Sequence, residues 1–138
     1  MNIKTEFLKI MAEQTEIALA TSVNNIPNVR IVNFYFDSNE NILYFSSFKG
    51  NDKIKEIELN PHVAFTTIPH SGNEHVKGKG TVKESSKTIF DVADHFIAKI
   101  PDYKNTIEFA GKSLILFELK FDTAIVTKDI HTIKTLKL

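Results

Sequence analysis

Two hydrophobic periods alternate along the chain. Apolar residues recur every three or four positions in residues 3–15, in the segment that begins at Asn51 or Asp52, and in residues 86–99, which predicts three amphipathic helices. Between them, short segments rich in β-branched and aromatic residues predict strands. The predicted strands are residues 17–23, 28–36, 42–47, 62–68, 75–84 and 113–127. Residues 129–138 are interpreted as a weak strand or irregular structure.

Turn signals separate neighbouring strands. Asn24-Asn25 predicts a hairpin turn, because asparagine tolerates a positive φ. Residues 37–41 predict a second turn, and either Asn51 or Asp52 is a candidate N-cap for the helix that follows the third strand. Short strands joined by hairpins, together with three helices, predict a mainly β domain: an antiparallel barrel or sandwich covered in part by helices.

The size of the chain and the pattern of strand 28–36 refine this picture. A length of 138 residues and a mass of 15.6 kDa correspond to one domain, residues 1–138. Strand 28–36 carries apolar residues on both faces, so we expect part of the outer face of the sheet to be covered too. In a chain this small, a second subunit is one candidate for that cover.

Composition weakens or excludes several functional classes. The 17 basic and 17 acidic residues cancel, which argues against nucleic acid and anionic membrane surfaces as partners. The absence of cysteine excludes disulfides, thiolate zinc sites and cysteine nucleophiles, and favours the cytosol. No apolar run approaches the roughly 20 residues of a transmembrane helix. An early acid and the lack of an apolar signal core argue against secretion, so we expect a cytoplasmic protein.

The chain contains a single arginine and sixteen lysines, and the arginine is the first residue of the candidate site. Arg30 lies on a predicted strand, Ser46 and Ser47 end another, and Lys53 lies in the first turn of the next helix. If the strands pair through the 37–41 turn, these groups meet at a helix N-terminus, whose free N–H groups and positive dipole end favour a phosphate. Arginine suits such a site because its planar fork can clamp two oxygens. The alternative is that these are solvated surface charges beside an ordinary turn.

The same stretch shows an ordered set of motifs. An Arg-Ile-Val strand at 30–32 precedes a strand that ends in Ser47; Lys53 follows six residues later, and Asn60-Pro61-His62-Val63 comes next. This set resembles the pyridoxamine 5′-phosphate oxidase-like family of FMN-binding split barrels. Segments 76–82 and 116–120 resemble later strands of that family, so the similarity covers roughly residues 10–128.

The resemblance implies an antiparallel six-stranded split β-barrel with flanking α-helices, FMN as cofactor, and a homodimer with FMN at the interface. The cofactor-binding residues that it implies are Arg30, Ile31, Val32, Asn33, Ser46, Ser47, Asn51, Asp52, Lys53 and His75. Arg30 and Lys53 would bind the phosphate, and the backbone of residues 31–33 would follow the edge of the isoalloxazine ring.

The other implied residues have more varied roles. Ser46 and Ser47 would hydrogen-bond the phosphate or the ribityl chain, and Asn51 would present helix-terminal amides together with Asp52. Asp52 departs from an ideal site, because an acid beside a phosphate is unfavourable unless it points away. His75 stands where some members of the family place a glutamine that reaches the flavin.

The implied function is an FMN-dependent oxidoreductase that transfers hydride or electrons to or from an unidentified small molecule, with NAD(P)H as one candidate donor. No catalytic acid or base is evident. The chain has no tryptophan and no C-terminal Trp- and Arg-bearing segment of the kind that holds the pyridoxal substrate, so pyridoxamine phosphate oxidation is not expected. Two alternatives stay open: a flavin-binding sensor or store without turnover, and a haem-binding split barrel with His75 or His131 as axial ligand.

Other candidate sites have simpler interpretations. The histidines show neither i, i+4 helical spacing nor a His-Glu-x-x-His motif, so no metal site is predicted. Ser46 and Ser47 lack a placed histidine and acid, which a serine nucleophile requires. The stripe of Lys77, Lys79 and Lys83 indicates a solvated strand face, because no aromatic residues interleave with it as in nucleic-acid sites.

Overall fold

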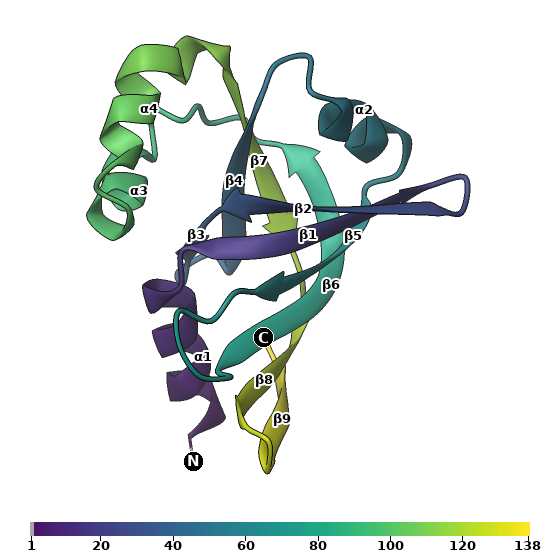
Figure 1. Cartoon of the computed structure of the whole chain (residues 1–138), viewed down its shortest axis with the longest axis vertical. Coiled ribbons are helices and arrows are strands. Elements are labelled where there is room, and N and C mark those ends of the chain that lie inside the picture. Colours follow the sequence, from purple (N-terminus) through teal and green to yellow (C-terminus); the bar gives the residue numbers. More distant parts are fainter. Residues whose placement is uncertain (1) are drawn as a thin grey trace.

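A computed structural model describes residues 2–138 (Figure 1). Its nine strands form one sheet in which every pair is antiparallel, and the path β2-β1-β5-β6-β7-β4-β3 curls into a split barrel. The strands are β1 (Glu16–Val23), β2 (Ile26–Asn33), β3 (Tyr35–Asp37), β4 (Ile42–Phe48), β5 (His62–Thr67), β6 (His75–Glu84), β7 (Leu114–Lys120), β8 (Thr123–Asp129) and β9 (Thr132–Lys137). The helices are α1 (Ile3–Glu13), α2 (Asp52–Leu59), α3 (Ala93–Lys99) and α4 (Tyr103–Ala110). The prediction of a mainly β split barrel with flanking helices is confirmed.

Strand 28–36, predicted as continuous, is interrupted at Phe34 by tertiary hydrogen bonds. The Phe34 N–H donates to the Thr15 carbonyl at 3.1 Å, and the Phe34 carbonyl accepts from the buried end of Lys99 at 3.1 Å. Because both backbone groups of Phe34 are bound elsewhere, the chain leaves β2 there and resumes as β3. The hairpin before β2 does follow the prediction, with Asn24 and Asn25 both at positive φ.

The C-terminal part of the sheet supplies the other strands beyond the expected six. Residues 113–127 divide into β7 and β8 at Phe121, whose ring turns into the core against Phe7, Phe36 and Phe65. After this bend the chain changes partners, from β4 to the first half of β6. The tail that was interpreted as weak strand or irregular structure is β9, which pairs with β8 along its length.

The helical predictions need two corrections. Residues 86–92 form turns instead of helix, because local side chains bind the backbone: Asp91 Oδ2 accepts from the Thr88 N–H at 2.8 Å and Ser85 Oγ from the Lys87 N–H at 3.1 Å. Helix α3 therefore begins only at Ala93. Helix α4 was not predicted at all. None of the helices within residues 2–138 is long and apolar enough to cross a membrane.

Two apolar clusters hold the fold together. The larger fills the barrel and includes Phe7, Leu19 and Phe45, each fully buried. The smaller cluster packs α3 and α4 on the outer face of β4 and β7 through Tyr44 and Phe96. Figure 1 shows the two helices beside these strands. Part of the outer face is thus covered within the chain, while Ile31 on β2 stays 59% exposed.

Strand β6 is the junction of the barrel, because it pairs with β5, β7 and β8. Gly80 lies where β6 passes closest to β7. A Cβ atom at this position would lie 2.1 Å from the Lys120 carbonyl oxygen, which is far inside van der Waals contact. Only glycine therefore allows the two strands to approach this closely.

Candidate functional site

The start of α2 is fixed by its cap. Gly50, at φ 81°, turns the chain after β4, and the Asn51 side chain accepts a hydrogen bond from the Lys53 N–H at 2.9 Å. Of the two candidate caps, Asn51 is thus the N-cap, and Asp52 is the first helical residue. This geometry turns Lys53 inward, where it is only 6% exposed.

A cavity of about 260 Å³ opens beside this helix start. It lies among the ends of β2 and β4, the beginning of α2, and α4. The residues that line it are Ile31, Val32, Asn33, Ser46, Ser47, Phe48, Asn51, Lys53, Tyr103, Thr106 and Leu114. Most of the residues predicted to bind a cofactor therefore meet around one cavity, although they come from three separate elements.

Two polar groups in the cavity wall lack partners. Lys53 Nζ forms no hydrogen bond or ion pair with any residue in the range 2–138; its nearest aromatic neighbour is the Phe45 ring, with 5.9 Å to the centroid. Burial, helped by the positive charge of Arg30, lowers the Lys53 pKa to about 8. Ser47 Oγ is buried without a hydrogen-bond partner. The ammonium of the largely buried Lys53 and the buried Ser47 hydroxyl, both at a helix N-terminus, suit an anionic ligand that binds both.

Another part of the cavity wall is formed by β4 and α4, which a side-chain hydrogen bond connects. Ser46 Oγ and Tyr103 Oη lie 2.5 Å apart. Burial raises the Tyr103 pKa, and the bond to Ser46 only partly opposes this, so the hydroxyl is neutral near pH 7. This pair joins α4 to the strand that carries Ser47.

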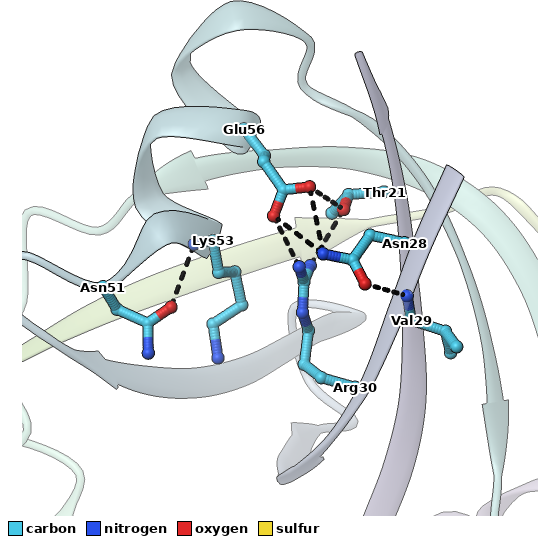
Figure 2. A network of polar contacts seen from close by, with 7 residues as sticks. All are labelled: Thr21, Asn28, Val29, Arg30, Asn51, Lys53 and Glu56. Atoms are coloured by element: carbon cyan, nitrogen blue, oxygen red, sulfur yellow. Dashed lines mark hydrogen bonds and ion pairs between the residues drawn. The ribbon is translucent and has the colours of Figure 1, made fainter. Parts of the chain in front are cut away.

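Arg30, Asp52 and His75 do not line the cavity. The Arg30 guanidinium instead contacts Glu56 at 2.5 Å and Thr21 Oγ1 at 2.8 Å (Figure 2). Asp52 is exposed, away from the cavity wall. His75 begins β6, next to Glu74, whose carbonyl accepts from the side chain of Gln14 just after α1. A direct contact of these three residues with a cofactor stays a prediction.

The cavity is also lined by four residues outside the predicted site: Phe48, Tyr103, Thr106 and Leu114. A weak signal for α4 does exist: Pro101-Asp102 is a helix-start pair, Tyr103 and Ile107 are apolar at i, i+4, and Gly111 follows the last turn. Both Tyr103 and Ile107 are indeed buried. Such a short pattern identifies a helix but gives no indication of what the helix packs against.

Histidines and acids do not gather elsewhere as a metal site. No group of three histidine, aspartate or glutamate side chains with suitable geometry occurs within the described range 2–138. His70 Nε2 lies 3.3 Å from Thr15 Oγ1, and His75 Nδ1 lies 2.7 Å from the Asn73 carbonyl oxygen, so each of these two histidines has its own partner.

Comparison with known proteins finds one matching family model. The family model described as pyridoxamine 5′-phosphate oxidase-like matches residues 10–132, which is most of the chain. The chain belongs to this family. In this pyridoxamine 5′-phosphate oxidase-like chain, the cavity brings Ser47 and Lys53 together with Ile31 and Val32 of the Arg-Ile-Val strand. No curated protein matches the chain.

Solved structures resemble this member of the family in fold. General stress protein 26 from Bacillus anthracis has 18% identity and a TM-score of 0.76 over 100% of both chains. An FAD-binding protein from Mesorhizobium loti has 18% identity and a TM-score of 0.68, over 87% of this chain and 90% of that one. A haem-binding protein from Mycobacterium smegmatis has 10% identity and a TM-score of 0.79, over 99% of this chain and 58% of that one. At these identities the similarity is one of fold alone.

Proposed function

We propose that the protein binds FMN and acts as a small oxidoreductase. The observation that carries the proposal is the unpartnered ammonium of the largely buried Lys53, in the same cavity wall as the buried and unpartnered Ser47 hydroxyl, at the start of α2. A phosphate monoester satisfies both groups at once, and the positive end of the helix dipole favours its charge. The residues therefore fit the phosphate end of the flavin.

The size of the cavity indicates how much of the ligand it takes. At about 260 Å³ it is smaller than the roughly 300–1,000 Å³ of sites that enclose a whole ligand. We assign it to the phosphate and the ribityl chain, with Lys53, Ser47 and Asn51 at the phosphate and the Ser46–Tyr103 pair along the chain. Residues 31–33 line the open side and would offer backbone groups to the ring.

FMN, when bound, supplies hydride and one-electron chemistry. The protein's own contribution is to bind and orient the flavin. Lys53 neutralises phosphate charge, and the β2 backbone offers N–H and C=O groups at the edge of the site. Among residues 2–138, no ionisable side chain other than Lys53 and Tyr103 lines the cavity, so we assign no catalytic acid or base.

The test is an absorption and fluorescence titration of the purified protein with FMN. We expect saturable quenching of flavin fluorescence and visible flavin bands that stay with the protein through gel filtration. A protein that shows no uptake of FMN would contradict the proposal. A Soret band after incubation with haem, without flavin uptake, would favour the haem alternative, for which the haem-binding structural neighbour is the support.

Anaerobic bleaching of the bound flavin by NADH or NADPH distinguishes an oxidoreductase from a carrier.

We further propose that the working form is a homodimer. Ile26, Val29 and Ile31 on the edge strand β2 are 70%, 63% and 59% exposed, and Ile31 also lines the cavity. A second copy that covers this surface would complete the wall that one chain leaves open. We expect a mass near 31 kDa, twice 15.6 kDa, by sedimentation equilibrium, and a shift to the monomer mass with weaker FMN binding for Ile31→Glu. A wild-type monomer that binds FMN fully would refute the dimer.

A further inference from the structure

The Glu56 carboxylate accepts hydrogen bonds from polar side chains of the β1–β2 hairpin. It accepts from Arg30 Nη2 at 2.5 Å and from Thr21 Oγ1 at 3.1 Å, and Asn28 Nδ2 lies 3.5 Å from both of its oxygens. Figure 2 shows the Arg30 side chain extending from β2 toward Glu56 on α2. The Lys53 side chain extends from α2 next to Arg30. Glu56 thus connects α2 to the β1–β2 hairpin through hydrogen bonds. It lies about one helical turn after Lys53 in α2.

This network is partly shielded from water and electrically balanced. The Arg30 and Glu56 side chains are 20% and 19% exposed, and Thr21 is 2% exposed. Burial raises the pKa of Glu56, but hydrogen bonds from Arg30, Thr21 and Asn28 outweigh it and hold the pKa below its usual range. Glu56 is therefore ionised at neutral pH, and Arg30 is its counter-ion.

A phosphate in the cavity would have to compete with Glu56 for Arg30. Moving the guanidinium to the ligand breaks a short ion pair and leaves the Glu56 carboxylate with only neutral donors close to a phosphate dianion. Losing one partner of a shielded ion pair is costly because the other charge stays behind. The cavity wall already contains one free cation, Lys53, among residues 2–138.

We infer that Arg30 and Glu56 are a positioning pair: they hold the start of α2, and with it Lys53, in place for the phosphate, and Arg30 does not bind the ligand itself. This inference rests on the proposed FMN function. It differs from the role that the family resemblance implies for Arg30. It also explains how Arg30 acts on the site from outside the cavity, since its charge helps to lower the pKa of Lys53.

A double-mutant cycle in FMN affinity separates the two roles. If the pair positions α2, Arg30→Ala and Glu56→Gln each weaken FMN binding about tenfold or more, and Arg30→Ala has little further effect in a Glu56→Gln background. If Arg30 contacts the phosphate, Glu56→Gln leaves affinity unchanged or improves it, and Arg30→Ala then causes its full loss in that background. The second pattern overturns the inference. Glu58→Gln, an exposed acid on the same helix, is the charge-matched control and should change nothing.

Urea unfolding of the same variants without ligand tests the pair independently of FMN. We expect both single variants to lower the unfolding midpoint, with a double-variant shift clearly smaller than the sum of the two. Additive shifts would mean that the residues do not act together, and would overturn the inference even if FMN binds. Absence of FMN binding by the wild type would refute the proposed function, whereas coupled unfolding shifts would still support the fastening of α2 by the pair.

Discussion

Lys53→Met is expected to weaken FMN binding by about 100-fold or more. The substitution replaces the four-carbon stem of lysine with an unbranched apolar side chain of the same length but removes the only cation in the cavity wall formed by residues 2–138. A hydrogen bond to a charged group contributes about 1.5–3 kcal/mol, and the loss of charge beside a phosphate adds to it. The measurement is the FMN dissociation constant from fluorescence quenching.

The same variant should be at least as stable as the wild type without ligand. An unpaired buried ammonium destabilises the folded state, so replacing it with an apolar side chain removes that cost. Lys55→Met, on the exposed side of α2, is the matched control and should keep wild-type affinity. If Lys53→Met and Lys55→Met bind FMN equally well, the assignment of the phosphate site is wrong.

The Lys53 pKa also predicts how affinity changes with pH. In the free protein this pKa is about 8, and a bound phosphate raises it, because the charged form is then stabilised. FMN binding should therefore weaken as the pH rises above 8, where binding requires proton uptake by Lys53. The phosphate is fully ionised above about pH 7 and adds no slope there. Lys53→Met should bind weakly but with no such dependence, which affinity measurements across this range would check.

Gly80→Ala is expected to cause the largest loss of stability of any single-methyl addition to the sheet. Its Cβ would lie 2.1 Å from the Lys120 carbonyl oxygen, and backbone on both strands must move to make room. Overpacking of this kind costs typically 1–3 kcal/mol, and we expect about 3 kcal/mol because the obstacle is backbone and not a flexible side chain. Urea unfolding measures the change.

Gly78→Ala in the same strand is the control. Its Cβ would lie 3.1 Å from the Phe65 ring and 3.3 Å from the Thr123 carbonyl oxygen, so shifts of a few tenths of an ångström make room for it. We expect a loss below about 1 kcal/mol, offset in part by the smaller entropy of the unfolded chain. Equal losses at the two positions would show that the close approach of β6 and β7 at Gly80 is not the cause.

Local patterns predicted much of the cavity, and tertiary contacts decided the rest. Ser47 and Lys53 were predicted from residue types at a strand end and a helix start, residues 31–33 were implied by the family resemblance, and all of them line the cavity. The partner of Arg30 could not be predicted in this way. Glu56 reads as one more polar residue on a helix, and nothing in the local pattern shows that α2 packs on the β1–β2 hairpin.

The errors in strand boundaries have the same origin. The sequence around Phe34 is as β-branched and aromatic as any strand, but Lys99, 65 residues later, binds the carbonyl that would otherwise continue the ladder. Tyr103 likewise belongs to the cavity only because α4 packs on β4. Period and propensity describe a segment's own preference, and these contacts override it.

The two walls of the cavity are far apart in the order of synthesis. Residues 31–53 supply the cation, the unpartnered hydroxyl and the helix start, but Tyr103 lies 50 residues after Lys53 (103 minus 53), and Leu114 later still. At about 5–20 residues per second, a ribosome needs roughly 3–10 s to bridge the 50-residue gap. During that interval the phosphate-binding groups exist without the wall that closes them in. Under the proposed function, the complete FMN site therefore forms only after α4 and the start of β7 have been synthesised.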